Sequence, residues 1–362
     1  MPTSDNVNYT SGTWNISGGT VGSTDKNLYF GNSTITMTNG NIDADQFRPT
    51  SSGTGSMDHS GGVVTTQSWM AVGELAGAEG TYTLSGEGTL NQGLSLGHNA
   101  FVLGGYGTGT LKMTGGEMNL SGNHGGYSAI LGYHGTGIGY AYVSGGTITS
   151  KNGILLGFSS TLSSSFKQSG GTVKVENGEI YIKANNSYLL EGGTLSVPKI
   201  TNNGTFSMTG GTLNVAETNF ALNQGGGNLS PGGDGIVGNS KLLGLEVTAG
   251  KWTLDFTENS MDMIEIGTGG LVITSLEEIL LVGNELAEEP LSFLTFTETK
   301  TEGLAETLSS LLKGTMASYY HVIDTVEGYA LAVNSTDVPE PSSWLLLLAG
   351  LGCCFAWRRK RG

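Results

Sequence analysis

Residues 107–116 read Gly-Thr-Gly-Thr-Leu-Lys-Met-Thr-Gly-Gly, and this stretch decides which fold the chain can adopt. Leu111 and Met113 alternate with polar residues, so the segment predicts a β-strand that buries one face and exposes the other. The glycine pair that follows accepts positive φ angles, which allow a tight turn. The stretch therefore predicts a strand, a glycine turn and a second strand.

The glycine pair recurs along the chain, each time followed by a threonine or another small residue and an apolar residue. The first glycines of the copies are Gly18, Gly61, Gly86, Gly115, Gly145, Gly170, Gly192 and Gly210. One such repeat cannot bury its strands alone, but stacked copies share one continuous core. The repeats therefore predict an all-β fold, a parallel β-solenoid (β-helix) over residues 1–240.

A second recurring element is an apolar residue that closes on a glycine. The glycines of this element are Gly73, Gly97, Gly104, Gly132 and Gly157. Residues 93–97 also match the G-x-S-x-G pattern around Ser95, and residues 135–139 contain three alternating glycines. Neither stretch has the strand-turn-helix context of a nucleophile elbow or a phosphate loop, so we interpret both as turns of the repeat.

The composition supports a thin, elongated core. Of 362 residues, 61 are glycine and 7 are proline, whereas only 37% are hydrophobic and 13% are charged. Glycine without a strict triplet period excludes collagen, and the recurring apolar positions argue against disorder.

Charge excludes nucleic acid as a partner. The chain has 16 basic and 31 acidic residues, and four of the basic ones lie in its last five positions. Such an acidic body repels phosphate backbones. The only cysteines are the adjacent Cys353 and Cys354, so the sequence predicts no bridge between distant parts, no zinc site and no cofactor.

Composition shifts after the glycine-proline-rich stretch at residues 225–235. Residues 241–337 are strongly acidic and combine strand-like runs with one segment, residues 304–312, whose leucines share a helical face. We expect a small mixed α+β subdomain that caps the open end of the solenoid.

The last 25 residues, 338–362, combine a Pro-Glu-Pro tripeptide, an apolar run and a basic end. The run is long enough for one C-terminal transmembrane helix if the bilayer thins slightly, and the basic end places its far side in the cytoplasm. The tripeptide segment is Val338, Pro339, Glu340 and Pro341; the membrane segment includes Trp344, Leu345, Leu346, Leu347, Leu348, Leu351, Cys353, Cys354, Phe355 and Trp357; the basic anchor is Arg358, Arg359, Lys360 and Arg361.

This tail resembles the bacterial PEP-CTERM sorting signal. The resemblance implies export, recognition by an exosortase in the inner membrane, cleavage near Pro339–Pro341 and delivery to the cell surface or extracellular matrix. The repeats resemble autotransporter-associated β-strand repeats, which implies a surface role. Proteins with this signal carry an N-terminal leader; residues 1–5 have no basic or apolar leader segment, so we expect one upstream of Met1.

Histidines and tyrosines in the body could bind a ligand, but each also has an ordinary structural explanation. His98, His124 and His134 lie in successive repeats and could stack as metal ligands, although solvated loop histidines are the favoured interpretation. Exposed tyrosines could stack on sugar rings or pack between rungs. The tyrosines concerned are Tyr106, Tyr127, Tyr133, Tyr140 and Tyr142.

The enzyme alternative rests on carboxylates near the N-terminus. Parallel β-helices include polysaccharide lyases and hydrolases, and Asp43, Asp45 and Asp58 stand near Arg48 and His59. We favour a non-enzymatic function instead. We predict an exported structural or adhesive protein that contacts extracellular polysaccharide or copies of itself, with the carbohydrate-active enzyme as the alternative.

Overall fold

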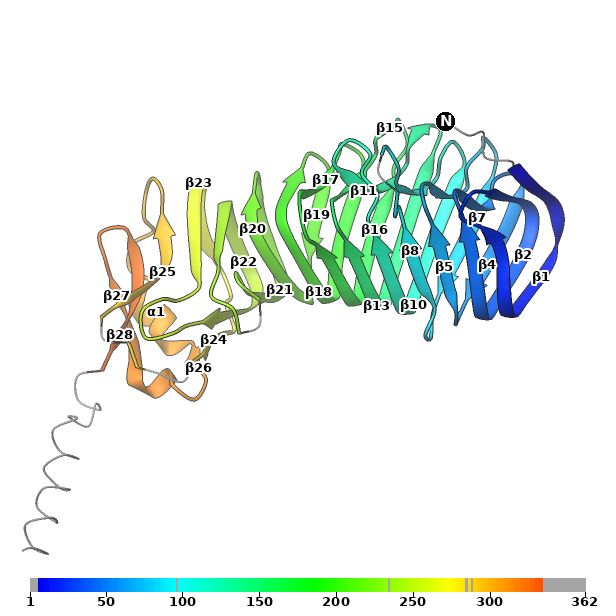
Figure 1. Ribbon diagram of the computed structural model, residues 1–362. Helices are drawn as coiled ribbons and strands as arrows, with labels where there is room; N and C mark the ends of the chain where they lie inside the picture. Colours follow the sequence, from blue (N-terminus) through cyan, green and yellow to red (C-terminus); the bar gives the residue numbers. More distant parts are fainter. Residues whose placement is uncertain (1–5, 96, 234, 284–285, 288, 335–362) are drawn as a thin grey trace, which may run out of the picture.

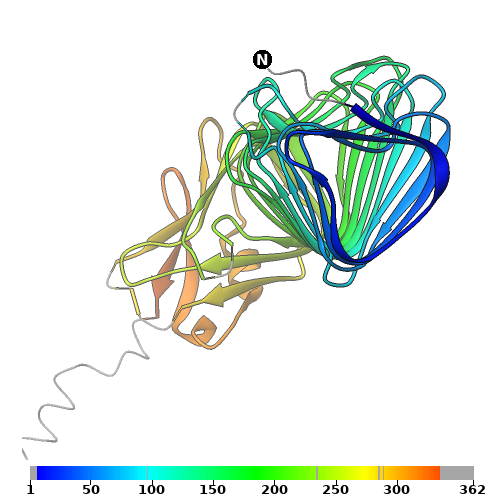
Figure 2. The ribbon, with the colours of Figure 1, turned by 45° about the vertical axis from the view of Figure 1, so that its right-hand side comes forward.

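The computed structural model describes residues 6–95, 97–233, 235–283, 286–287 and 289–334. These residues form a rod of stacked strands that ends in a small mixed unit (Figure 1). Seen obliquely from the end formed by β1 (Asn6–Ser23), the rod has a triangular outline (Figure 2). Each turn of the chain, here called a rung, therefore contributes to three faces, which we name A, B and C.

Strands within each face pair in parallel from one rung to the next. Face A contains parts of β1, β2 (Asn27–Ala44), β4 (Thr54–His59), β7 (Glu79–Leu84), β10 (Thr108–Leu120), β13 (Ile138–Ser150), β16 (Ser165–Val175), β18 (Ser187–Asn202), β19 (Thr205–Met208), β21 (Ala221–Leu229), β22 (Asn239–Asp255) and β23 (Met263–Ile273). Face B adds β5 (Val63–Thr66), β8 (Thr89–Gln92), β20 (Thr212–Thr218), β24 (Glu278–Val282) and β26 (Leu312–Lys313). Face C adds β3 (Phe47–Thr50), β6 (Met70–Val72), β9 (Phe101–Leu103), β11 (Tyr127–Leu131), β14 (Gly153–Leu156), β17 (Glu179–Ile182) and β25 (Leu291–Phe296). This arrangement confirms the predicted parallel β-solenoid.

The glycine pairs form the corner between faces A and B. The corner is a bend inside a continuous strand, because β10 and β13 each run through their glycine pair with a shift in register. Gly116, Gly146, Gly171, Gly193 and Gly211 each have φ between +67° and +78°. They stack in one column although the spacing between them falls from 30 residues to 18.

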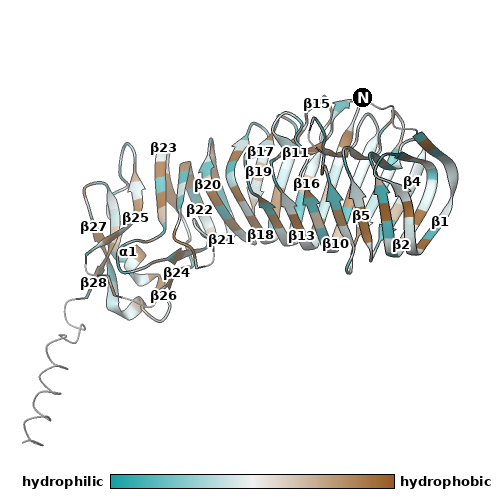
Figure 3. Cartoon of the chain, in the orientation of Figure 1, coloured by the Kyte–Doolittle hydropathy of each residue, from teal (hydrophilic) through white to brown (hydrophobic). Residues whose placement is uncertain are grey.

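The core is a column of inward side chains whose neighbours along each strand point outward, so that hydrophobic and hydrophilic residues alternate (Figure 3). On face A, the rings of Phe166 and Tyr188 stack with centroids 4.7 Å apart, and Phe206 continues the stack at 5.7 Å from Tyr188. Each fully buried large apolar side chain contributes about 1.5–3 kcal/mol. The stack of aromatic rings thus ties successive rungs together.

Face C buries side chains on its outer side as well. Ala71, Val102, Ile130 and Leu155 are at most 2% exposed and form a second, smaller core outside the solenoid. Partly buried rings pack against it, and the short parallel pair of β12 (His134–Gly135) and β15 (Ser159–Ser160) lies in the loops next to face C. The packed rings are Trp69, Tyr127, Tyr133, Phe158 and Tyr181.

The parallel stack continues past residue 240, where the composition indicated its end. β22 begins at Asn239 and pairs in parallel with both β21 and β23. The glycines at 225–227 form another corner within β21, and residues 230–233 and 235–238 lie outside the strands. The chain therefore becomes more acidic near residue 240 without any interruption of the parallel strand pairing.

Pairing becomes antiparallel at the C-terminal end. β25 and β27 (Tyr320–Asp324) both pair with β28 (Gly328–Val333) in antiparallel register. The helix expected at residues 304–312 is present as α1 (Ala305–Ser310), which buries Leu308, and a 3-10 turn follows at Ala317–Tyr319.

Candidate functional site

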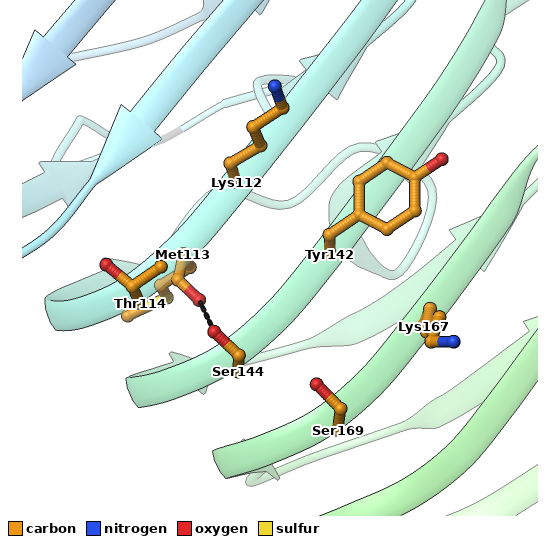
Figure 4. Close-up of a pocket in the computed structure, with 7 residues that line it drawn as sticks. All are labelled: Lys112, Met113, Thr114, Tyr142, Ser144, Lys167 and Ser169. Atoms are coloured by element: carbon orange, nitrogen blue, oxygen red, sulfur yellow. Dashed lines mark hydrogen bonds between the residues drawn. The ribbon is translucent and has the colours of Figure 1, made fainter.

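A groove on the outer side of face A brings together three side chains from successive rungs. Lys112 on β10, Tyr142 on β13 and Lys167 on β16 are register partners, so they form one outward column along the rod. Their chain neighbours Leu111 and Met113 point into the core and are buried, which fixes Lys112 on the outside. Figure 4 shows the three side chains on their adjacent strands.

The groove has a volume of about 520 Å³, within the range of small-ligand sites. Its polar border consists of Thr114, Ser144 and Ser169, the residues that precede the glycine pairs, and the Ser144 hydroxyl donates to the Met113 carbonyl at 3.4 Å (Figure 4). Tyr142 is 43% exposed, and the ring of Tyr140 on the same strand lies 6.5 Å from it, centroid to centroid, at an interplanar angle of 27°.

The two lysines of the groove differ in their partners. The Lys167 ammonium lies 2.8 Å from the Glu191 carboxylate on the next rung. Lys112 makes no ion pair with any residue that the structure describes. The groove therefore holds one compensated and one uncompensated positive charge on either side of an aromatic ring.

The groove lies within a stretch of the chain, residues 88–175, that holds more lysines than carboxylates and is here called the basic band. This stretch carries four lysines, Lys112, Lys151, Lys167 and Lys174, and a single acidic residue, Glu117. The stretch that contains the groove therefore has a net charge of +3, although the Glu191 carboxylate that pairs with Lys167 lies outside it. The whole chain has a net charge of −15, so the residues outside the band together carry −18.

Sequence reasoning considered Tyr142 but missed its two lysine neighbours. The signal was present, because Lys112, Tyr142 and Lys167 each stand three residues before the first glycine of a pair. Aligning the repeats on their glycines would have placed the three side chains in one column.

The tyrosines divide into exposed and packed rings. Tyr106 and Tyr142 are 47% and 43% exposed. Tyr127 and Tyr133 are partly buried against the second core on face C, and the Tyr127 hydroxyl donates to Glu179 at 3.1 Å. Tyr140 is also partly buried. Tyr127 and Tyr133 therefore pack against the protein, as the alternative of packing between rungs predicted.

The three histidines share the aromatic surface over face C without converging. The rings of His98 and His124 lie 5.8 Å apart, and His124 Nε2 lies 3.1 Å from the Tyr133 hydroxyl. His134 Nδ1 instead lies 3.0 Å from the Ser159 hydroxyl. Burial, together with the charges of His98 and His134, lowers the pKa of His124. Among the described residues no group of three or more His, Cys, Asp or Glu side chains is placed to hold a metal ion.

The carboxylates of the enzyme alternative lie on different faces. Asp43 belongs to face B and Asp58 to face A, since their register partners are Thr65 and Thr83 respectively. The Asp45 carboxylate accepts a hydrogen bond from the Ser68 hydroxyl at 2.8 Å, on the way to face C. The three carboxylates are therefore not brought together.

The two other members of that cluster have structural partners. Arg48 pairs with Glu74 at 3.1 Å and its guanidinium lies 4.2 Å from the ring centre of Tyr29. His59 is fully buried, with Nδ1 2.8 Å from the Tyr82 hydroxyl and Nε2 3.0 Å from the Gly62 carbonyl. Neither side chain points at an aspartate of the group.

The glycine-flanked serine has a structural role. The Ser95 hydroxyl donates to the Gln67 carbonyl of the preceding rung at 2.6 Å, in a loop that leads to face C. No helix follows it among the neighbouring described residues, and the same holds for the glycines at 135–139. Both stretches belong to the loops of the solenoid.

The tail motif lies outside the described residues. The tail motif comprises the tripeptide Pro339–Pro341, the apolar run from Trp344 to Trp357, and the basic residues 358–361. Within residues 6–334, as far as they are described, no helix combines the length and hydropathy needed to cross a bilayer.

Comparison with known proteins identifies the tail. Residues 337–361 match the family model of the PEP-CTERM protein-sorting motif, which covers the tripeptide, the apolar run and the basic end. No curated protein and no solved structure matches the chain. The motif implies an exported protein that an exosortase sorts. The chain is thus a parallel β-solenoid that carries a PEP-CTERM sorting motif at its C-terminal end.

Proposed function

We propose that this chain is a structural or adhesive rod of the bacterial cell surface or extracellular matrix. The sorting motif at residues 337–361 carries the proposal, because it directs a chain to the exosortase pathway. The solenoid fits this destination, since a rod of stacked rungs presents a long surface without needing disulfides or a metal. The likeness of the repeats to autotransporter-associated repeats agrees with the same role.

The tail would act in three parts. The apolar run at residues 344–357 holds the chain in the inner membrane, and Arg358, Arg359, Lys360 and Arg361 keep its far end in the cytoplasm. The exosortase then cleaves near Pro339–Pro341 and releases the body to the surface.

Repetition supports adhesion rather than catalysis. Outward positions recur on every rung, so several weak contacts to one polymer add up to a strong attachment. Most glycoside hydrolases use two carboxylates on either side of one bond. Asp43 and Asp58 lie on different faces, so we do not propose that alternative.

The test replaces Pro339, Glu340 and Pro341 by alanine in the chromosomal gene of the host. We expect the natural chain to lose its tail and reach the cell surface, and the variant to keep its tail and stay in the inner membrane. Intact mass and cell fractionation report both outcomes. A Ser342→Ala, Ser343→Ala chain is the matched control and behaves as the natural one. If the triple variant were processed and exported normally, the proposal would be wrong.

A further inference from the structure

We propose that the groove formed by Lys112, Tyr142 and Lys167 binds an acidic polysaccharide, one whose sugar rings carry carboxylate groups. The proposal deepens the adhesive function and rests on it, because that function brings the body to the place where such polymers occur. It names one site and one class of ligand.

The spacing of the groove suits a sugar chain that runs along the rod. Neighbouring rungs are about 4.8 Å apart, so Lys112 and Lys167 stand roughly 10 Å apart along the axis, with Tyr142 between them. This is about the length of a disaccharide. The exposed Tyr142 ring receives the apolar face of one sugar, and the two ammonium groups receive carboxylates on either side.

The border of the groove adds hydrogen-bonding groups for sugar hydroxyls. Thr114, Ser144 and Ser169 line its lower edge as a row of hydroxyls, one from each rung. The Ser144 and Ser169 hydroxyls donate to the carbonyls of Met113 and Val143, so their oxygens are left to accept hydrogen bonds from sugar hydroxyls. Because the row repeats from rung to rung, it can pair with a polysaccharide in several registers. This matches a polymer ligand better than a single small molecule.

Charge selects the acidic class. Residues 88–175 hold four lysines and one glutamate, whereas the rest of the body is strongly acidic. A polyanion is attracted more strongly to this band than to the acidic remainder of the body, and within the band the exposed Lys112 beside Tyr142 favours the groove. A neutral polymer would gain nothing from the band, so its binding would not respond to the lysines or to salt.

Glu191 limits the attraction in the natural chain. Its carboxylate pairs with Lys167 at 2.8 Å and both groups are partly exposed, so it competes with a ligand carboxylate for the same ammonium. Removing the charge of Glu191 frees Lys167 without touching the groove lining. The site therefore offers a variant that strengthens binding, which a merely structural role would not.

The experiment measures binding of polygalacturonate to the full-length chain in mild detergent, with dextran as the neutral comparison. We expect polygalacturonate to bind at low salt and to dissociate as salt rises, and dextran to bind weakly throughout. Lys112→Gln with Lys167→Gln, and separately Tyr142→Ala, each reduce affinity about tenfold or more. Glu191→Gln increases affinity. The control Lys174→Gln, in the same band but on face B, leaves it within about twofold.

Two results would overturn the proposal. One is equal affinity for dextran and polygalacturonate, and the other is unchanged affinity in both the double lysine variant and Glu191→Gln. All substituted side chains point outward, and circular dichroism checks that each variant keeps its β-structure. Binding is measured with purified protein, so a failure of sorting in the host and a failure of this site give separate results.

Discussion

At the scale of single residues, the second glycine of each pair is held by two independent constraints. Gly146 has φ of +78°, and a Cβ added there would lie 2.6 Å from the Gly116 carbonyl oxygen of the rung before. Gly116 and Gly171 meet the same combination with their own neighbours. The glycines therefore permit the close approach of consecutive rungs at this corner.

A Gly146→Ala substitution should cost about 3 kcal/mol or more of unfolding free energy, because it combines backbone strain with a backbone clash. Gly125 also has positive φ but open space around an added Cβ, so Gly125→Ala should cost only about 1 kcal/mol. Gly18 has neither constraint, and Gly18→Ala should be nearly neutral. Urea unfolding of the three variants checks this order, and equal losses would refute the clash.

Three buried polar side chains repeat one hydrogen-bonding device at the same corner. His59 Nε2 donates to the Gly62 carbonyl, and Nδ1 accepts from the Tyr82 hydroxyl. Gln168 uses its amide in the same way, donating to the Gly171 carbonyl at 3.3 Å and accepting from the Tyr188 hydroxyl at 2.7 Å. Gln224 does so with the Gly227 carbonyl and the indole N–H of Trp252. Neutral imidazole and carboxamide are thus interchangeable here.

Burial lowers the pKa of His59, which makes the stability of the rod depend on pH. The unfolded chain binds a proton near its ordinary pKa while the folded chain does not, so stability is lost as pH falls below that value. His59→Gln should remove this share of the loss and cost less than about 1 kcal/mol at pH 8, because Gln copies the bonds of Gln168.

Urea unfolding at pH 8 and pH 5 provides the measurement. The natural chain should lose more stability between the two pH values than the His59→Gln chain. Identical losses in both proteins would show that His59 is not the titrating group.

At the scale of elements, the sequence predicted where strands occur but not where each strand begins and ends. The alternation around Leu111 and the glycine pair at residues 115–116 predicted two strands joined by a turn, and both strand segments are present as parts of the single strand β10. It did not reveal that the corner stays within one paired strand. That outcome depends on the neighbouring rungs, which supply the hydrogen bonds through the bend.

The outer surface of face C was also beyond sequence reasoning. Val102, Ile130 and Leu155 stand at outward positions, where alternation predicts polar residues. They are apolar because loops and aromatic rings such as Tyr133 cover them. The alternation of residues in a strand does not predict the conformation of such loops. The groove of Lys112, Tyr142 and Lys167, by contrast, could have been predicted by aligning the repeats on their glycines.

At the scale of the whole molecule, the rod is nearly one-dimensional. Face A strands spaced about 4.8 Å apart give a length of roughly 50 Å, and each rung contacts chiefly its neighbours. The antiparallel strands β25, β27 and β28 close the C-terminal end, with Tyr329 fully buried among them. Damage at this end should therefore remain local.

A Tyr329→Ala substitution tests this. It should cost the C-terminal unit about 3–5 kcal/mol, as for other large buried rings, and also removes hydrogen bonds to Thr301 and Leu304. Hydrogen exchange should accelerate in β25–β28 and stay unchanged in β7 and β10. Val326→Ala is the control, since Val326 is 98% exposed. Uniform acceleration along the chain would show that the rod unfolds as one unit.

The stacked glycine column has a consequence for how such a chain can change. Gly193 and Gly211 are 18 residues apart and Gly116 and Gly146 are 30 apart, yet both pairs are stacked neighbours. The extra residues of the long rungs are accommodated in the loops around face C, such as residues 121–126 and 157–164. The length and composition of these loops can therefore vary while the strands keep their register. New binding specificities can arise in the loops without a change in the solenoid.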